Sequence, residues 1–191
     1  MTSNDTSLLC RVAGAVFVLG LLLEGAAARA GEWFDLDDKA LATFDFEGMT
    51  LATSAVEFEQ QFPDAKRDRE PVDEEIGLEC YEVRDLKNAD VARFYFCDGR
   101  LYQLEIGYNL ARVEKLGGMQ AVLQKLVDTW GPADHAGESR WTWQRPMYKR
   151  RADFYAWPER AQLTITDMAW MPVVAQRLKR QDEKQRPDLG F

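Results

Sequence analysis

The stretch that most constrains this chain is residues 91–108, VARFYFCDGRLYQLEIGY, in which two alternating, aromatic-rich runs meet at Asp98-Gly99. An Asp-Gly pair between alternating runs is the strongest short-range signal for a β-hairpin. A three-residue loop that begins at Cys97, with the glycine at a left-handed bulge position, puts the apolar side chains of both runs on one face. These inward side chains are Ala92, Phe94, Phe96, Tyr102, Leu104 and Ile106. A two-residue loop would mix two arginines into this set, so the pattern favours the three-residue loop.

Residues 1–30 have the pattern of a secretory signal peptide. Residues 12–23 are an unbroken apolar run, too short to span a bilayer, and small residues follow it. We expect cleavage before Gly31 and a secreted or periplasmic protein with no stable membrane insertion. The alternative is an uncleaved anchor, but Glu24 interrupts the apolar stretch where a span would need to continue. Cys10 precedes the apolar run, a position that does not fit lipoprotein processing.

The formal charge of the chain is −8 at pH 7, and removal of residues 1–30 leaves it unchanged because that segment carries two acids and two bases. A net negative charge argues against non-specific binding to nucleic acid or to an anionic membrane. The composition, 46% hydrophobic with 12% aromatic residues, is typical of a globular chain. We expect one α+β domain over residues 31–172, followed by an exposed helix or tail over residues 173–191.

Two cysteines remain after the predicted cleavage, Cys80 and Cys97, and an even pair in an exported protein predicts a disulfide. Antiparallel pairing of residues 80–83 with residues 94–97 would place the two sulfur atoms opposite each other. Two buried free thiols are the alternative. The only histidine, His135, is far from both cysteines in sequence, so we expect neither a metal site nor a cofactor.

Capping signals and periodicity place the main elements along the chain. Ser54 and Glu57 predict a capping box at the start of a short helix that Pro63 ends. Residues 119–130 repeat apolar side chains at helical spacing, and Gly131 follows as a stop signal. Strands are expected over residues 80–84, 140–145, 152–157 and 161–167, with Ala161, Leu163 and Ile165 facing inward.

At a shift of 60 residues, one segment of the second half of the chain matches one of the first half at three of four positions. The matched segments are Ala92-Arg93-Phe94-Tyr95 and Ala152-Asp153-Phe154-Tyr155. Each half has the order helix, strand, strand, turn, strand, which predicts two αβββ units over about residues 48–108 and 109–170. Their strands would form one antiparallel sheet with helices packed on one face. The alternative is that any two aromatic hairpins look alike.

Three short motifs link this pattern to known folds. They are Gly48-Met49-Thr50 before the first helix, Trp130-Gly131-Pro132 followed by Trp141-Thr142-Trp143, and the hairpin FYFCDGRL at residues 94–101. Over about residues 48–167 the chain resembles the duplicated helix-plus-hairpin folds of the β-lactamase-inhibitory proteins and of the SmpA/OmlA-type outer-membrane-assembly lipoproteins. The resemblance implies a binding fold without catalysis and names no partner. The chain departs from it by lacking a lipid-carrying cysteine and by dividing the motif between its two halves.

One histidine raises the question of catalysis. His135 and Ser139 lie in one short segment and would be the base and nucleophile of a secreted hydrolase. A triad needs its members on separate rigid elements and oxyanion donors beside the serine, and the sequence has no such elbow and no Gly-rich donor loop. We therefore expect His135 in an exposed turn and no enzyme activity, with the hydrolase as the alternative.

Two sets of residues are candidates for a binding surface. Helices on one face of the sheet would leave the outward side chains of both hairpins open to a ligand, unless the chain termini fold over them to make a second small core. A basic cluster beside Trp141 and Trp143 is the other candidate, and its alternative is a charged strand edge that prevents aggregation. The outward residues are Arg93, Tyr95, Leu101, Gln103, Asp153, Tyr155, Trp157 and Gln162, and the cluster is Arg140, Arg145, Lys149, Arg150 and Arg151.

The sequence thus predicts an exported, non-catalytic binding domain whose ligand is a protein or a cell-envelope polymer. Rigid aromatic and arginine side chains gathered on an open sheet are the types enriched at binding hot spots. A secreted hydrolase that uses His135 and a purely structural envelope protein are the alternatives.

Overall fold

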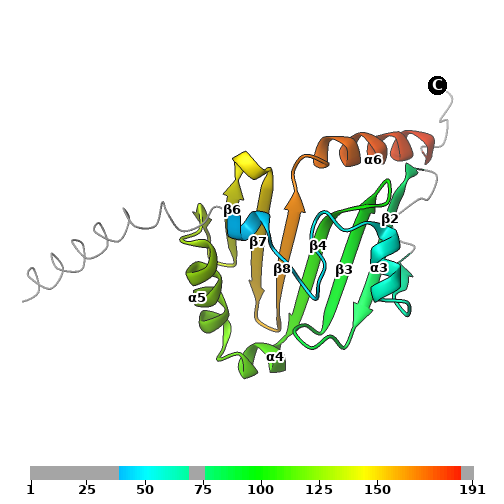
Figure 1. The fold of residues 1–191 in the computed structure, drawn as a ribbon. Helices are drawn as coiled ribbons and strands as arrows, with labels where there is room; N and C mark the ends of the chain where they lie inside the picture. The colour runs from blue at the N-terminus through cyan, green and yellow to red at the C-terminus, as the bar shows by residue number, and fades with distance from the viewer. Residues whose placement is uncertain (1–38, 69–75, 186–191) are drawn as a thin grey trace, which may run out of the picture. The chain divides into compact units, whose positions relative to one another are not determined.

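An antiparallel sheet of eight strands, in the order β1-β2-β3-β4-β8-β7-β6-β5, organises the chain (Figure 1). The computed structural model describes residues 39–68 and 76–185, all within one compact unit. The strands are β1 Lys66–Asp68, β2 Leu78–Arg84, β3 Val91–Cys97, β4 Arg100–Asn109, β5 His135–Ala136, β6 Arg140–Arg145, β7 Arg150–Trp157 and β8 Arg160–Asp167. The helices are α2 Lys39–Ala42, α3 Ala55–Gln61, α4 Leu110–Lys115, α5 Met119–Trp130 and α6 Met171–Gln185, with a 3-10 turn, η3, at Pro146–Tyr148. The predicted α+β class with an antiparallel sheet is confirmed.

One face of the sheet packs against α2, α3, α4 and α5 through a core rich in aromatic side chains. From α3, the fully buried Phe58 meets Phe94 and Phe96 of β3 at ring-centroid distances of 4.7 and 5.3 Å. From α5, Trp130 meets Trp143 of β6 edge-on at 5.6 Å. Burial of one large apolar side chain contributes roughly 1.5–3 kcal/mol, so these contacts hold the helices against the sheet.

Two predicted helices, α3 and α5, are confirmed, together with the signal that begins the first and the signal that ends the second. The Ser54 hydroxyl accepts a hydrogen bond from the Glu57 N–H at 3.2 Å, and the Glu57 carboxylate accepts one from the Ser54 N–H at 2.8 Å, so the capping box of α3 is complete. α5 ends at Trp130, where Gly131 adopts a φ of 79° that glycine reaches without strain. Both helices therefore begin or end where local chemistry requires it.

The hairpin between β3 and β4 turns differently from the prediction. Asp98 and Gly99 form a two-residue turn with positive φ values of 51° and 70°. The register then shifts between Tyr95 and Phe96, where a bulge places the extra residue Tyr102 in β4. The predicted three-residue loop is wrong because a two-residue turn with positive φ already matches the strand twist, and the bulge lies beyond the turn.

This bulge changes the faces on which two side chains lie. The sequence predicts Leu101 on the outward face, but its side chain is fully buried in the helix-covered core. It predicts Tyr102 on the inward face, but Tyr102 is buried on the opposite face. The other predicted inward residues of the hairpin are confirmed as core residues: Ala92, Phe94, Phe96, Leu104 and Ile106.

No disulfide joins Cys80 and Cys97, so that prediction is wrong. Cys80 lies opposite Tyr95 and Cys97 lies opposite Leu78, which offsets the two cysteines by two positions on adjacent strands. Two residues of a strand span about 7 Å, and this offset does not fit disulfide geometry. Both side chains are buried, at 1% and 0% exposure.

α6 packs on the sheet face opposite the other helices, at one end. Its Val174 is buried in a small cluster with Leu78, Cys97 and Tyr102. The Arg177 guanidinium donates to the Asp98 carboxylate at 2.8 Å, which ties the helix to the β3–β4 turn. The sequence predicts an exposed helix or tail and helices on one face only. The helix is present, but it covers part of the second face.

The predicted signal peptide, residues 1–30, lies outside the described residues. Among the helices of the described ranges, none is long and apolar enough to cross a membrane. Export and signal cleavage therefore stay predictions.

We expect Gly99→Ala to lower the free energy of unfolding by roughly 1–2 kcal/mol, because a Cβ atom disfavours a positive φ. A steric clash would not contribute, since a Cβ built at Gly99 meets no heavy atom within 4 Å. Gly99→Asn should recover part of the loss because asparagine tolerates the left-handed region. Urea unfolding of the three proteins checks this expectation. Equal stability of the glycine and alanine forms would contradict the observed turn.

Candidate functional site

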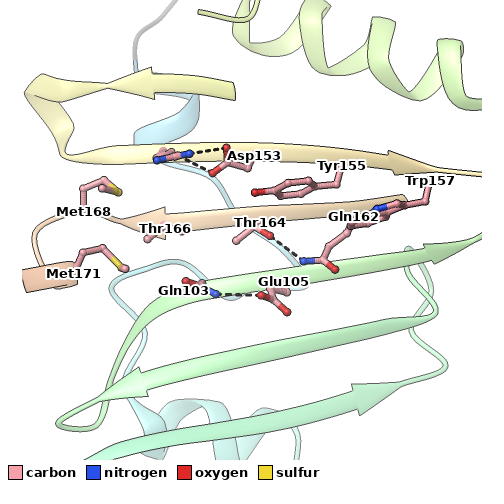
Figure 2. A pocket seen from close by; sticks show the side chains of 11 residues that line it. Gln103, Glu105, Asp153, Tyr155, Trp157, Gln162, Thr164, Thr166, Met168 and Met171 are labelled. Atoms are coloured by element: carbon pink, nitrogen blue, oxygen red, sulfur yellow. Dashed lines mark hydrogen bonds and ion pairs between the residues drawn. The ribbon is translucent and has the colours of Figure 1, made fainter. Parts of the chain in front are cut away.

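A hollow of about 430 Å³ lies on the sheet face that α2 to α5 leave uncovered (Figure 2). It extends over β4, β8 and β7, the strands at and beside the centre of the sheet, and reaches the start of α6. Successive side chains of a strand point to opposite faces, so every second residue of these strands enters it. The lining residues are Gln103, Glu105, Arg151, Asp153, Tyr155, Trp157, Gln162, Thr164, Thr166, Met168 and Met171.

Asp153 of β7 is the charged centre of the hollow. Its side chain is only 8% exposed, and its carboxylate accepts hydrogen bonds of 2.7–3.1 Å from Arg140, Thr142 and Arg151. Burial by itself raises the pKa of Asp153, but the hydrogen bonds from Arg151, Thr142 and Arg140 outweigh it and hold the pKa below its usual value. Because two guanidinium groups share one carboxylate, this group carries a net positive charge.

Tyr155 and Trp157 follow Asp153 along the same side of β7. Their rings are stacked, with centroids 5.5 Å apart and an interplanar angle of 10°. The Arg140 guanidinium lies 5.1 Å from the centre of the Tyr155 ring, and that of Arg160 lies 4.7 Å from the centre of the Trp157 ring. Cation–π contacts at exposed sites contribute roughly 0.5–1 kcal/mol each. The stack therefore restrains both rings, which stay partly exposed.

Glu105 of β4 forms the opposite side of the hollow. Its carboxylate accepts hydrogen bonds from the Tyr95 hydroxyl at 2.9 Å and from the Gln103 amide at 3.2 Å. Burial, together with the charge of Glu105, raises the pKa of Tyr95, so the hydroxyl stays a hydrogen-bond donor at neutral pH. Beside this group Arg93 pairs with Glu82 at 2.9 Å. The acids on this side are already bonded within the chain.

Met168 and Met171 line the end of the hollow nearest α6 (Figure 2). Met168 is 38% exposed, and Met171 is partly buried. Thioether side chains are flexible and polarizable, and they adapt to differently shaped apolar partners. In the direction in which β7 runs, the lining of the hollow therefore changes. It is apolar at Met168 and Met171, charged at Asp153 and aromatic at Trp157.

The structure gathers most of the predicted outward-facing residues on this face. Gln103, Tyr155 and Trp157 line the hollow. Arg93 and Tyr95 lie next to it on β3, directly opposite residues of β4 that line it. Leu101 does not belong to this face, because the bulge in β4 turns its side chain into the core.

The predicted basic cluster does not form one surface. Arg140 and Arg151 reach the hollow through Asp153. Arg145 instead donates to the Trp130 carbonyl at the end of α5, at 2.6 Å. Arg150 forms a 2.6 Å ion pair with Asp167, whose side chain is 5% exposed. Lys149 is an exposed turn residue with a φ of 52°. Of the predicted cluster, therefore, only Arg140 and Arg151 bring positive charge to the hollow.

His135 lies on β5, a short strand at the sheet edge, rather than in the turn that the sequence predicts. Its side chain and that of Ser139 are exposed, and neither residue lines the hollow. Within residues 39–68 and 76–185, no three His, Cys, Asp or Glu side chains are grouped as metal ligands.

Five lining residues of the hollow are absent from the candidates that the sequence gives: Glu105, Thr164, Thr166, Met168 and Met171. Glu105 continues the alternation of β4 that assigns Gln103 to the outward face. Thr164 and Thr166 continue the alternation that already assigns Gln162 to the outward face, so extending that alternation along β8 would have found them. Met168 and Met171 enter the site because the chain turns after β8 and α6 packs on this face. No strand periodicity reveals that turn.

No protein-family model, no curated protein and no solved structure matches this chain. The resemblance to duplicated helix-plus-hairpin folds therefore stays a prediction. The described residues establish an α+β fold whose antiparallel sheet carries a polar hollow on one face.

We expect Asp153→Asn to lower the free energy of unfolding by about 2 kcal/mol at neutral pH, because two guanidinium groups lose their shared carboxylate. The pKa of Asp153 is lower in the folded chain than the value of about 3.9 in an unfolded chain. The ionised carboxylate therefore stabilises the fold above about pH 4, and this contribution is lost as the pH falls through the folded pKa. Urea unfolding between about pH 3 and pH 7 should show a stability gap that is constant at the upper end and shrinks below about pH 4. A gap that does not depend on pH would contradict this assignment.

Proposed function

We propose that this chain is an exported, non-catalytic binding domain that recognises a protein or a cell-envelope polymer through the hollow on its sheet. The observation that carries the proposal is the set of rigid, partly exposed side chains on β7 and its neighbours: Arg140, Arg151, Tyr155 and Trp157. Tyrosine, tryptophan and arginine are the residues most enriched at binding hot spots. Because their positions are already restrained, a ligand would pay little side-chain entropy to engage them.

The contrast between the two ends of this face supports a binding surface rather than a second core. Under α6 the side chains of Leu78, Cys97 and Tyr102 are 7% exposed or less. In the hollow Tyr155 and Trp157 are only partly buried, and the residues between them and β4 are polar. α6 thus makes a small core at one end and leaves the rest of the face open.

The alternative functions have less support. A secreted hydrolase would need His135 beside a second titratable group in a pocket, whereas His135 lies exposed on an edge strand outside the hollow. Asp153 is held ionised by two arginines, which does not suit a general acid. A purely structural protein leaves the exposed stack of Tyr155 and Trp157 without a role.

We also infer that the domain consists of two αβββ units, about residues 48–108 and 109–170, as the sequence repeat predicts. The strand order supports this, because β1-β2-β3-β4 meets β8-β7-β6-β5 in reverse order at the β4–β8 pair. The strands that contain the matched segments occupy equivalent places: β3 is the neighbour of β4, and β7 is the neighbour of β8. The hollow would then lie over the junction of the two units, as the resemblance to duplicated binding folds implies.

We expect Trp157→Ala to weaken retention of a partner from cell-envelope extract on the immobilised protein by about tenfold or more. The same change should lower the free energy of unfolding by only about 1 kcal/mol, because the ring is partly exposed and loses mainly its contacts with Tyr155 and Arg160. Quantitative capture and urea unfolding measure the two effects.

Phe154→Ala is the matched comparison on the same strand. Phe154 is fully buried on the helix-covered face, so its loss should cost roughly 3–5 kcal/mol of stability. Arg180→Ala, on an exposed part of α6, should change neither capture nor stability. Undiminished capture by the Trp157 variant would refute the proposed binding face.

A further inference from the structure

We propose that the occupant of the hollow is an extended acidic segment of a protein, with an apolar side chain two positions from an acidic one. This inference rests on the proposed function and specifies its ligand. The acidic side chain would lie at Arg140 and Arg151, which bond Asp153. The apolar side chain would lie at Met168 and Met171 (Figure 2).

Charge is the first argument. Arg140 and Arg151 each use Nε and Nη2 to bond Asp153, and the Nη1 atoms of both make no hydrogen bond to any described residue. Two cations thus share one acid and keep donors available for a second carboxylate. The side chains of Arg140 and Arg151 are 42% and 29% exposed, so a ligand can reach them. In a protein of net charge −8, this is a local site for an anionic group.

The β4 side of the hollow, opposite β7, favours placement of the acidic side chain of the ligand over β7. Glu105 of β4 is an anion whose oxygens already accept from Tyr95 and Gln103, so it offers a ligand carboxylate only repulsion. Between the two walls β8 presents the neutral side chains of Gln162, Thr164 and Thr166. A ligand chain along the hollow would therefore place its acids over β7.

The spacing between the charged and apolar parts of the hollow sets the pattern of the ligand. Arg151 lies opposite Thr166 in the β7–β8 ladder, and Met168 follows directly after the end of β8, where its N–H still donates to the Lys149 carbonyl at 2.7 Å. Two strand residues correspond to about 7 Å, which is also the distance between side chains on one side of an extended peptide. An acidic side chain and an apolar side chain at positions i and i+2 therefore match Arg151 and Met168.

Two observations favour a polypeptide over an anionic polysaccharide. The methionine end is an adaptable apolar surface, which suits an aliphatic side chain rather than a sugar. Tyr155 and Trp157 stack on each other, and Arg140 and Arg160 lie over them, so a sugar ring would have to compete with these groups for the ring faces, whereas a peptide can contact the exposed parts of both rings without displacing them.

The test uses fluorescein-labelled peptides of twelve residues and the full protein. The matching peptide repeats glutamate, serine, leucine, serine, which puts acid and leucine on one side of an extended chain. Its control has the same composition in the repeat glutamate, leucine, serine, serine, which puts them on opposite sides. A third peptide replaces glutamate with lysine. We expect the matching peptide to bind about tenfold or more tightly than the other two, and to weaken as salt is raised from about 50 to 500 mM.

Variants of the protein locate the binding. Arg151→Gln and Met168→Glu should each weaken the matching peptide about tenfold or more, while Arg151→Lys should restore part of the loss. The paired controls are Arg180→Gln and Met147→Glu, exposed residues outside the hollow, and both should bind as the wild type does. Met168 is exposed, so its variant stays informative even if Arg151→Gln unfolds. Thermal melts identify any variant that does not fold.

Each outcome decides between this inference and the proposed function. Equal binding of the two isomeric peptides, or binding that survives Met168→Glu, overturns the inference. Binding of polygalacturonate that depends on Trp157, with no peptide bound, overturns it but supports the proposed function with a polymer ligand. If no peptide binds in a way that depends on Arg151 and Met168, and neither polygalacturonate nor an envelope protein is retained in a Trp157-dependent way, both proposals fail.

Discussion

Pairing of β4 with β8 is the interaction on which the rest of the structure depends. Seven residue pairs, from Gln103 opposite Thr166 to Asn109 opposite Arg160, join strands from the two halves of the chain. The register puts Leu104 and Ile106 beside Ile165 and Leu163 in the helix-covered core. A slip of one residue would exchange these apolar side chains for the polar ones of the hollow, so burial of the core face strongly selects the observed register.

The two faces of the sheet are therefore coupled. Apolar burial on one face determines which polar side chains meet on the other, and it does so across strands that are distant in sequence. Asp153 illustrates the consequence: its neighbour Phe154 is fully buried in the core, and this fixes the direction in which the carboxylate points. The arginines of β6 and β7 then satisfy a buried charge that would otherwise be costly. Stability of the core and geometry of the hollow have the same origin.

Features that depend on a few neighbouring residues were predictable from the sequence. The capping box at Ser54, the stop at Gly131 and the alternation of β7 and β8 are local, and the structure confirms them. Features that depend on register or on distant packing were not. The cysteine pairing differs by two positions, a shift that keeps every side chain on its expected face and leaves no trace in the alternation. The candidate site was only partly predictable for the same reason. Strand alternation is local and reveals Tyr155 and Trp157, but the bulge that buries Leu101 and the packing of α6 depend on register and distant contacts.

The hydrogen bonds of Arg177, which tie α6 to the β3–β4 turn, affect the order in which the chain folds. Arg177 donates to the carbonyl of Ile76, one hundred and one positions earlier, at 2.7 Å, and to Asp98. These contacts close a very long loop. Such contacts form late in folding, because the chain loses the entropy of the open loop before the contacts can stabilise it. A nascent chain can pair β2, β3 and β4 as they emerge, but Leu78, Cys97 and Tyr102 stay open to water until α6 leaves the ribosome. One end of the sheet is therefore completed only after α6 has been synthesised, well after the strands that it covers.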